Sequence, residues 1–374
     1  MSSDQNIMLT ALRLARRGLG NVWPNPAVGC VIVSAAENGG QVLGRGWTQP
    51  GGRPHAETVA LDQARAQFGA AALVGAQVFV TLEPCSHTGR TPPCADALID
   101  AGVGRVVIAC EDPDPRVSGS GTDRLKAAGL QVETGLCQRE AETVNAGFMT
   151  RVREGRPLVT LKTATTSDGR IATRTGESQW ITGSAARAHA HLMRATHDAI
   201  AVGVGTVASD DPSLTSRLPG LENRSPLRVV FDSNLRVSPK AQVIRTAGET
   251  PTWVIACKGA DAGRRQMLEG AGVHVVEVAS QDGHVDLSAA LQALGEAGIT
   301  RLMVEGGALV STALLRAGLV DQLYWFRAPS LIGGDGVPPF GDLGVEDISE
   351  VPSFKSVSST PIGDDTLDIF VRVP

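Results

Sequence analysis

The sequence contains few aromatic side chains and has no excess of positive charge. Of its 374 residues, 4% are aromatic, with a single tyrosine, and the formal net charge is −5. Proteins that bind RNA or DNA usually present a basic surface, and single-strand binders add aromatic side chains on which bases stack. The composition therefore argues against nucleic-acid binding as the main function.

Long hydrophobic runs are also missing. The longest apolar stretch, Ala199–Ala208, is about half as long as a membrane span needs. The first residues, Met1–Leu9, include an acid and no cationic segment, which is not the pattern of a secretory signal. We therefore expect a soluble, cytoplasmic protein that does not bind membranes. In that setting, six cysteines favour metal-binding or core roles over a disulfide framework.

Length and apolar patterning predict two α/β domains. A chain of 374 residues is long enough for two cores, and 42% hydrophobic with 20% charged residues is an ordinary globular composition. In residues 1–153 helical and strand patterns alternate, which predicts a sheet with helices on both faces. Glu154-Gly155-Arg156-Pro157 interrupts the pattern, so the boundary is placed at 153/154. Residues 154–374 form a second α/β domain that is richer in strands.

Hydrophobic periodicity places the individual elements. Helices are expected at Met8–Arg17, His55–Phe68, Cys94–Ala101, Thr122–Ala128, Gln138–Arg153, Ala185–Ala195, Leu287–Ala297 and Leu309–Ala317. Strands are expected at Val28–Val33, Gln41–Trp47, Gln77–Leu82, Arg105–Cys110, Leu130–Thr134, Leu158–Thr165, Ala199–Val204, Leu227–Asp232, Thr252–Cys257, Val273–Val278, Arg301–Glu305, Gln322–Ala328 and Leu367–Val373.

Three short segments of the first domain point to a catalytic zinc site. They are His55-Ala56-Glu57, Pro84-Cys85 and Pro93-Cys94. Imidazole and thiolate are ligands that Zn²⁺ prefers, and a catalytic site uses three protein ligands and leaves one position for water. His55, Cys85 and Cys94 supply three ligands, which leaves the fourth position for solvent. A structural zinc site, the alternative, normally has four ligands.

Glu57 is expected to transfer protons rather than to bind the metal. It lies two residues after His55, and that spacing on a helix does not bring two side chains to one face. Zinc deaminases use such a glutamate to carry a proton from water to the leaving amine. The other cysteines, Cys30, Cys110, Cys137 and Cys257, lie in or beside apolar runs and are interpreted as core or inert residues.

At this point the chain resembles a known family. The stretch Thr81–Cys94 closely resembles the bacterial deaminase/reductase family of riboflavin biosynthesis, and Pro24–Cys30 is similar to its N-terminal motif. Eight residues separate Cys85 from Cys94, unlike the Cys-x-x-Cys of cytidine-type and tRNA deaminases. The resemblance covers essentially the whole chain. It implies a cytidine-deaminase-like three-layer domain followed by a dihydrofolate-reductase-like domain.

The resemblance also implies substrate contacts in the first domain. It places Asn25 and the loop Ser86–Thr91 against a pyrimidinone that carries ribose 5-phosphate. His87 and Arg90 are hydrogen-bond donors in this loop, and arginine is suited to bidentate phosphate contacts. The alternative is that each is only an exposed loop residue.

In the second domain, Val304-Glu305-Gly306-Gly307 ends an apolar run and precedes a helix. Strand, Gly-Gly and helix form a phosphate-binding geometry, because glycine permits close backbone approach and a helix N-terminus attracts anions. Taken alone this signal is weak, since Gly-Gly often makes only a tight turn. It is not the Gly-x-Gly-x-x-Gly fingerprint, so a Rossmann domain is not supported.

Resemblance extends to four segments of this domain: Leu161–Ala164, Gly176–Thr182, Gly205–Pro212 and Val304–Gly307. It implies NADPH contacts at Ala164, Trp180, Thr206, Asp210, Ser233, Gly307, Ala308, Leu309, Val310, Ser311, Thr312 and Ala313. It implies substrate contacts at Ser178, Arg194, Leu214, Arg217 and Glu305.

Roles for some of these residues follow from their chemistry. Arg194 and Arg217 can bind the substrate phosphate, and Lys162 with Glu305 can steady the sugar carbon that accepts hydride. Two alternatives stay open: Trp180 as a core aromatic, and Asp210 with Asp211-Pro212 as a helix cap and turn.

The sequence therefore predicts a bifunctional enzyme with Zn²⁺ and NADPH as cofactors, which acts on a small-molecule pyrimidine ribose phosphate. It deaminates 2,5-diamino-6-ribosylamino-4(3H)-pyrimidinone 5′-phosphate and then reduces the ribosyl group to ribityl. The resemblance suggests a homo-oligomer, a dimer or larger. Three alternatives are a deaminase whose second half has lost activity, an RNA-editing protein and a non-catalytic zinc scaffold.

Overall fold

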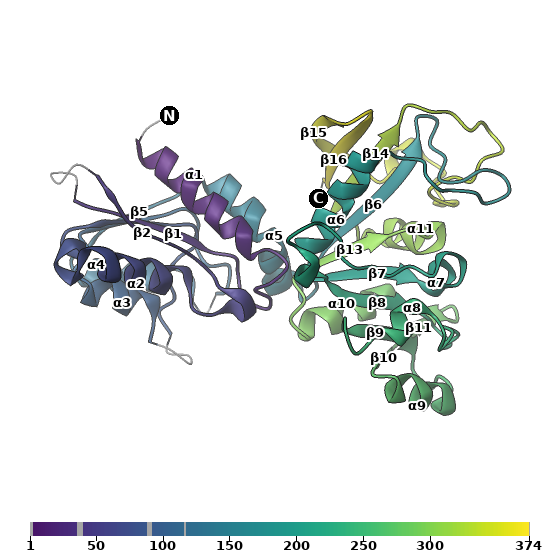
Figure 1. Ribbon diagram of the computed structural model, residues 1–374, viewed down its shortest axis with the longest axis horizontal. Coiled ribbons are helices and arrows are strands. Elements are labelled where there is room, and N and C mark those ends of the chain that lie inside the picture. Colours follow the sequence, from purple (N-terminus) through teal and green to yellow (C-terminus); the bar gives the residue numbers. More distant parts are fainter. Residues whose placement is uncertain (1–2, 36–39, 88–91, 116, 374) are drawn as a thin grey trace. The chain divides into compact units, whose positions relative to one another are not determined.

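The computed structural model describes residues 3–35, 40–87, 92–115 and 117–373. The chain divides into two compact units, unit 1 at Met1–Gly155 and unit 2 at Arg156–Pro374 (Figure 1). Their boundary lies two residues beyond the expected one, because the last helix of unit 1 continues to Glu154. That helix ends at Gly155, whose left-handed conformation (φ 73°) terminates it.

Unit 1 is built on a five-stranded mixed sheet in the order β2-β1-β3-β4-β5. β1 pairs antiparallel with both β2 and β3, whereas β3, β4 and β5 are parallel. The strands are β1 (Gly29–Val33), β2 (Val42–Trp47), β3 (Gln77–Val80), β4 (Arg105–Ile108) and β5 (Gln131–Thr134).

Helices cover both faces of this sheet and make three layers (Figure 1). They are α1 (Ser3–Ala15), α2 (Ala56–Phe68), α3 (Cys94–Asp100), α4 (Ser120–Ala127) and α5 (Gln138–Glu154). Glycines allow two of them to approach the sheet closely: a Cβ at Gly29 would collide with the α1 backbone, and one at Gly46 with the α2 backbone. The close approach at Gly46 fixes where α2 begins, and α2 carries the first site residues.

Unit 2 contains a nine-stranded sheet in the order β10-β9-β8-β7-β13-β6-β14-β16-β15. The strands from β10 to β14 in this order are parallel, and β16 and β15 add two antiparallel strands. The strands are β6 (Leu158–Thr166), β7 (Ala199–Gly203), β8 (Leu227–Phe231), β9 (Thr252–Cys257), β10 (His274–Val278), β13 (Arg301–Glu305), β14 (Gln322–Ala328), β15 (Phe354–Ile362) and β16 (Asp365–Arg372); β11 (Ser280–Gln281) and β12 (His284–Val285) form a separate hairpin.

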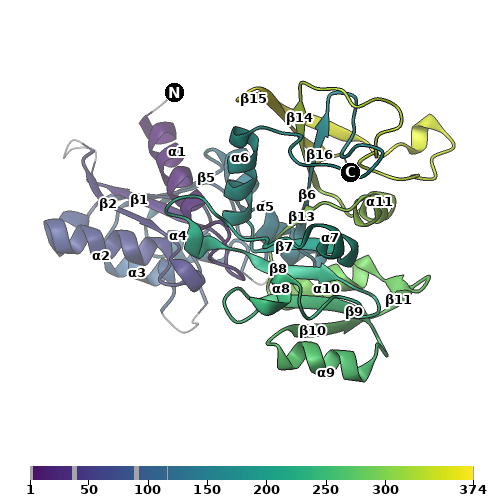
Figure 2. The ribbon, with the colours of Figure 1, turned by 45° about the vertical axis from the view of Figure 1, so that its right-hand side comes forward.

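Helices also lie on both faces of the second sheet (Figures 1 and 2). Ile200, Val230 and Val254 pack in one core cluster with residues of α7, α8 and α9, whereas a Cβ at Gly203 on the opposite face would touch Val310 of α11. The helices are α6 (Ser184–Ala195), α7 (Val204–Asp210), α8 (Gln242–Arg245), α9 (Ala262–Gly270), α10 (Leu287–Glu296) and α11 (Ala308–Arg316).

The observed elements differ from the expected ones at a few positions. α7 begins at Val204, where only the end of a strand was expected, and α9 was not expected because its sequence is largely polar. Its start is nevertheless capped, since the Asp261 side chain accepts the Arg264 N–H. β15 was also missed, because an outer strand with mostly exposed side chains lacks the alternation of a half-buried one.

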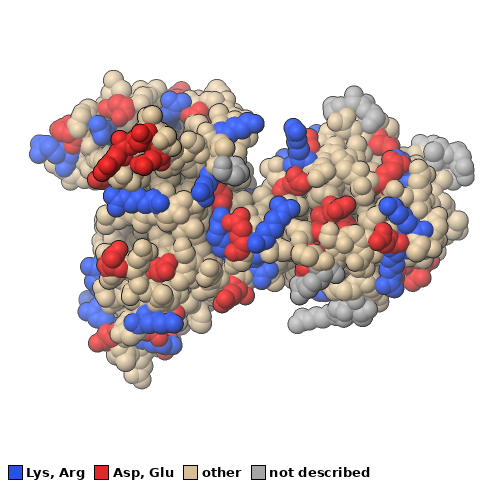
Figure 3. Space-filling view, turned by 180° about the vertical axis from the view of Figure 1, so that it is seen from behind, with Lys and Arg blue, Asp and Glu red and all other residues tan. Residues whose placement is uncertain are grey.

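On the face shown in Figure 3, basic and acidic side chains are interspersed over both units. The field on this face therefore does not have a single sign over a large area. Among the described residues, no helix combines the length and the apolar character that crossing a membrane requires.

Candidate active sites

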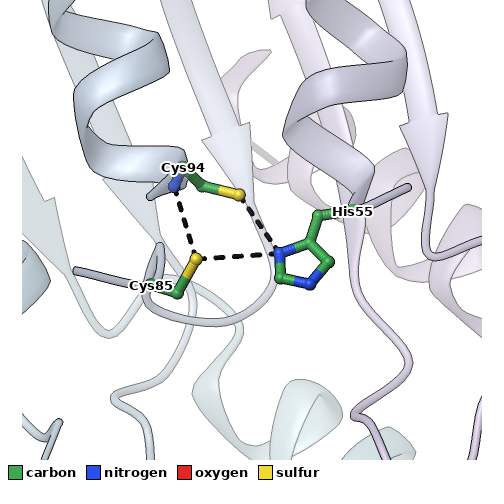
Figure 4. Close-up of side chains that lie close together, drawn as sticks. All are labelled: His55, Cys85 and Cys94. Carbon is green, nitrogen blue, oxygen red and sulfur yellow. Dashed lines mark hydrogen bonds between the residues drawn. The ribbon is translucent and has the colours of Figure 1, made fainter. Parts of the chain in front are cut away.

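The three expected zinc ligands come together in unit 1 (Figure 4). His55 is the residue before α2, Cys94 is the first residue of α3, and Cys85 lies in the loop after β3. Their ligand atoms all lie within 4.8 Å of one another. His55 Nδ1 is 3.2 Å from Cys94 Sγ and 3.7 Å from Cys85 Sγ.

The local backbone favours thiolate at this site. The Cys94 backbone N–H donates to Cys85 Sγ at 3.3 Å, and the positive end of the α3 dipole faces the same sulfur. A hydrogen bond from the Cys94 thiol and a further one from His55 lower the pKa of Cys85 to about 4, although burial opposes the shift. The hydrogen bond to Cys85 in turn raises the pKa of Cys94, together with burial and the charge of Glu57.

This donor set fits a zinc ion. One imidazole nitrogen and two sulfurs point toward a common centre, which is the ligand chemistry that Zn²⁺ prefers. Three protein ligands are the number found in catalytic zinc sites, where a further position is taken by water or substrate. Among the described residues, no fourth Cys, His, Asp or Glu joins this group.

Glu57 lies beside the ligand group but is not part of it. It is in the first turn of α2 and only 4% of its surface is exposed. Burial and the nearby negative charge of Cys85 raise the pKa of Glu57 to about 7. A carboxyl group with a pKa near neutrality can both accept and release a proton at physiological pH.

A buried carboxylate fixes the loop that carries Cys85. Glu83 is 4% exposed, and its two oxygens accept four backbone N–H groups, from Asp112, Gly119, Gly121 and Thr122, at 2.9–3.3 Å. These bonds tie the start of the loop to the segment that leads into α4. The position of Cys85 therefore depends on a segment about thirty residues further along the chain.

The loop that carries Asn25, an expected substrate residue, lies next to the segment before α2. A Cβ at Gly52, three residues before His55, would collide with the Asn25 side chain, so the two loops are in close contact. Asn145 of α5, which is 2% exposed, anchors this loop, because its Oδ1 accepts the Ala27 N–H at 2.9 Å. Asn25 thus contacts the segment that leads to His55.

Of the other substrate contacts expected in unit 1, Ser86 and His87 are among the described residues. Ser86 is held by Arg124 of α4, whose Nη1 donates to the Ser86 carbonyl at 3.1 Å and which also pairs with Asp96. His87 is exposed. Arg90 lies outside the described residues.

In unit 2, Glu305 is the centre of an ionic group at the carboxyl end of β13, beside the middle of β6. Arg194 of α6 binds it with two parallel bonds, Nε to Oε1 at 2.7 Å and Nη2 to Oε2 at 2.9 Å. Lys162, its register partner on β6, has its Nζ 3.9 Å from Oε2. Burial by itself would raise the pKa of Glu305, but the charges of Arg194 and Lys162 lower it to about 2.

Arg194 was expected to bind the substrate phosphate, but in the structure it is paired with Glu305. Besides its two bonds to Glu305, its Nη1 donates to the Thr215 carbonyl at 3.0 Å, and its side chain is 13% exposed. The charge of a neighbouring carboxylate attracts a guanidinium before any ligand arrives. Arg217, which is exposed, is the more accessible of the two arginines for a phosphate.

The other expected substrate residues differ in exposure. Ser178 is exposed. Leu214 is 3% exposed and packs in the core with a left-handed backbone (φ 56°), so only its backbone could face a ligand.

The geometry fits a dinucleotide phosphate at the ends of β7 and β13. These strands are parallel neighbours; α7 follows β7 directly, and α11 follows β13 after Gly306-Gly307. A Cβ at Gly307 would lie 3.0 Å from Thr206 Oγ1, so a side chain there would crowd the gap between the two helix starts. Two helix N-termini at one sheet edge favour an anion, and Gly307 leaves room for it.

The other residues expected to contact NADPH differ in how exposed they are. Trp180 is 68% exposed, with the Arg187 guanidinium 4.7 Å above its ring, so the alternative of a core aromatic is wrong. On α11, Leu309 is 87% exposed and Ala313 is exposed, but Ser311 and Thr312 are buried within the unit, where Thr312 accepts the Gly341 N–H. Ala308 and Val310 are partly buried in the first turn.

Three more are at or near the ends of strands or helices. Ala164 is partly buried on β6, and Ser233 follows β8, where its hydroxyl accepts the Val285 N–H. Asp210 is the last residue of α7. The next residue, Asp211, ends that helix with a left-handed backbone, and its Oδ1 accepts the Gln242 N–H at the start of α8.

Sequence reasoning missed Glu83, Asn145 and His191. Asn145 and His191 each bind a backbone group of a loop that carries an expected site residue, whereas Glu83 lies in such a loop itself and ties it to the segment before α4. The only sequence signal for Asn145 is an amide on the buried face of an amphipathic helix. His191 precedes Arg194 by three residues on α6, a spacing that puts both on one face.

Comparison with known proteins relates both units to one kind of enzyme. Residues 157–367 match the RibD C-terminal domain, and residues 1–110 match the cytidine and deoxycytidylate deaminase zinc-binding region. The chain is 42% identical to the riboflavin biosynthesis protein RibD of Bacillus amyloliquefaciens, over 97% of this chain and 94% of that one. It is also 42% identical to RibD of Escherichia coli K12, over 97% of each chain.

Solved structures agree with these matches over the full length. RibD of Acinetobacter baumannii superposes with a TM-score of 0.86 at 37% identity and covers 99% of both chains. A Thermotoga maritima diaminohydroxyphosphoribosylaminopyrimidine deaminase/5-amino-6-(5-phosphoribosylamino)uracil reductase gives 0.85 at 34% identity, again over 99% of both chains.

Proposed function

This chain belongs to the RibD family of bifunctional riboflavin biosynthesis deaminase/reductases, and from that premise we propose which of its residues perform the two reactions. Unit 1 has the cytidine-deaminase-like fold and unit 2 the dihydrofolate-reductase-like fold of the family. The enzyme uses Zn²⁺ and NADPH.

In unit 1, His55, Cys85 and Cys94 would hold the zinc ion, and the bound ion would supply the Lewis acidity that makes water a nucleophile near neutral pH. Glu57 takes the proton from the attacking water and passes it to the leaving amine. The substrate is 2,5-diamino-6-ribosylamino-4(3H)-pyrimidinone 5′-phosphate, and the products are ammonia and the uracil analogue. Asn25, His87 and Arg90 bind the substrate.

In unit 2, the bound NADPH would supply the hydride for reduction of the ribosyl group to ribityl, which gives 5-amino-6-ribitylamino-uracil 5′-phosphate. Lys162 and Glu305 lie at the sugar carbon that accepts it. The cofactor is held along the sheet edge by Thr206, Asp210 and Ser233, by Ala164 and Trp180, and by Gly307, Ala308, Leu309, Val310, Ser311, Thr312 and Ala313. Because Ser311 and Thr312 are buried, they act by shaping α11.

Arg217 binds the substrate phosphate in this half. Ser178 and the backbone of Leu214 contact the same substrate. Arg194 serves this site by holding Glu305 ionised and in place, which its two parallel bonds to the carboxylate support.

One observation carries the proposal for the deaminase half. A buried carboxyl group, Glu57, stands beside a group of exactly the three ligand side chains that a catalytic zinc ion needs. A purely structural zinc site would not need that buried acid.

The test is Glu57→Gln, which keeps the side-chain volume and all three ligands. Zinc content and thermal stability should stay near those of the wild type, while ammonia release should fall by at least about a hundredfold. NADPH oxidation with the deaminated compound should be unchanged. Ammonia release near the wild-type rate would show that zinc is only structural here.

Two further properties are proposed on less direct grounds. The six free cysteines support a reducing compartment, the cytoplasm, which cell fractionation would test. We also expect a homo-oligomer, a dimer or larger, as the family resemblance implies. Sedimentation of the purified protein would test this.

A further inference from the structure

His191 of α6 connects the ionic group of Glu305 to the loop that carries Arg217. Its ring lies one helical turn from Arg194, on the same helix face. His191 Nδ1 is 3.2 Å from the Thr215 carbonyl, and the same carbonyl accepts Arg194 Nη1. The His191 carbonyl also accepts the Ser216 hydroxyl at 3.2 Å. Three hydrogen bonds therefore hold the loop 213–217 against α6.

The partners of the ring fix its tautomer. A carbonyl can only accept, so Nδ1 carries the hydrogen. On the other side, Arg217 Nη2 lies 3.5 Å from Nε2, and a guanidinium can only donate, so Nε2 presents its lone pair. Only the neutral ring makes both bonds. Burial, then the charges of Arg194 and Arg217, lower the pKa of His191 and favour that form, while Glu305 opposes them.

Arg217 has two contacts that orient its guanidinium. Nη1 donates to Ser213 Oγ at 3.1 Å, and Nη2 donates to His191. A guanidinium has five N–H donors in one plane, so these contacts leave donors for an external anion. Since the side chain is exposed, fixing its direction lowers the entropy that it would otherwise lose on binding a phosphate.

We propose that His191 is a positioning residue of the reductase half, which holds the Thr215 carbonyl with Nδ1 and the Arg217 guanidinium with Nε2, and so presents Arg217 to the 5′-phosphate of the substrate. The inference rests on the proposed function, in which Arg217 binds that phosphate. His191 itself does not touch the reacting atoms.

Two substitutions separate the two bonds of the ring. In His191→Asn the amide nitrogen takes the place of Nδ1 and keeps the bond to Thr215, but nothing accepts from Arg217. In His191→Gln the amide oxygen takes the place of Nε2 and keeps that acceptor. Arg194 continues to bind the Thr215 carbonyl in both variants, so the loop should keep its fold.

The measurement is NADPH oxidation by the full chain, with the deaminated substrate and with the same compound lacking its phosphate. His191→Asn should raise KM for the phosphorylated substrate about tenfold, with kcat and the KM for NADPH unchanged. The dephosphorylated compound should react equally well with variant and wild type. His191→Gln should retain most of the affinity.

A double variant tests whether His191 acts through Arg217. If it does, adding His191→Asn to Arg217→Ala should cause no further loss. His284→Asn, an exposed histidine of β12, is the matched control and should behave as the wild type. Ammonia release and zinc content check that each variant is folded.

The proposal is overturned if His191→Asn leaves KM unchanged, if it impairs both compounds equally, or if its effect adds fully to that of Arg217→Ala. These outcomes presuppose a wild type that oxidises NADPH with the phosphorylated substrate. A wild type that did not would instead contradict the proposed function.

Discussion

At the scale of single residues, the zinc site depends on a few side chains whose removal has defined consequences. Cys85→Ser should reduce the zinc content from about one ion per chain to near zero and abolish ammonia release, because a hydroxyl is a much poorer ligand than a thiolate. The metal content of the purified variant measures this. Cys257→Ser, at the end of β9 in unit 2, should keep its zinc. Full occupancy in Cys85→Ser would contradict the ligand assignment.

A buried histidine gives unit 2 a pH-dependent stability. His197 is 5% exposed, its Nδ1 donates to the Met193 carbonyl, and its Nε2 accepts the Thr160 hydroxyl. Burial, together with the charge of Arg301, lowers its pKa from 6.5 to about 4. The unfolded chain therefore binds the proton first as the pH falls. The stabilisation that neutral His197 gives the folded state is complete above about pH 6.5, and it is lost as the pH falls from there to pH 4.

His197→Gln should remove this part of the pH dependence. Between pH 7 and pH 5 the wild type should lose about 2 kcal/mol of its free energy of unfolding through this histidine. Urea unfolding at both pH values would measure it, and other titrating groups cancel when the two proteins are compared. An identical change in unfolding free energy in both proteins would show that His197 is not the group responsible.

At the scale of elements, α5 completes the deaminase site although it lies beyond the matched zinc-binding region, residues 1–110. Its residue Asn145 accepts the Ala27 N–H of the loop that carries Asn25. Asn145→Leu fills a similar volume but leaves that N–H buried without its acceptor, at a cost of about 1–3 kcal/mol. We expect a raised KM for the pyrimidine substrate in ammonia release, with zinc content retained.

Thr143→Ala on the same helix is the control, because Thr143 is exposed and its hydroxyl donates to the Arg139 carbonyl of the same helix. If both variants had the same KM as the wild type, α5 would have no part in positioning the substrate loop.

At the scale of the whole molecule, each unit has its own core and its own site. Arg156, the first residue of unit 2, binds Asp321 through two bonds at 2.7 and 2.8 Å, so the unit is anchored from its first residue. A chain that begins at Arg156 should fold and oxidise NADPH with the deaminated substrate. Circular dichroism and the loss of NADPH absorbance would measure this.

Glu305→Gln in the full chain is the complementary experiment. It should slow reduction, because the neutral amide no longer pairs with Arg194 and Lys162. Zinc content and ammonia release should stay at wild-type values. An equal fall in ammonia release would contradict the independence of the two sites.

The sequence by itself determined the zinc chemistry and most of the elements. The zinc ligands lie in short segments beside prolines, and their residue types restrict which metal can bind and which reaction it can support. Strands with buried centres such as β9 and β13 have the expected bounds, because their apolar runs end where burial ends. The polar edge strand β15 had no such signal.

Only the tertiary structure decided how the polar groups pair. Asn145 and Ala27 are 118 residues apart, and Arg194 and Glu305 are 111 apart. Such contacts depend on which helix face packs against which strand, and hydrophobic periodicity specifies the face but not the partner. The sequence alone therefore could not show that Arg194 pairs with Glu305. A charged side chain binds the nearest opposite charge, and only folding determines which charge is nearest.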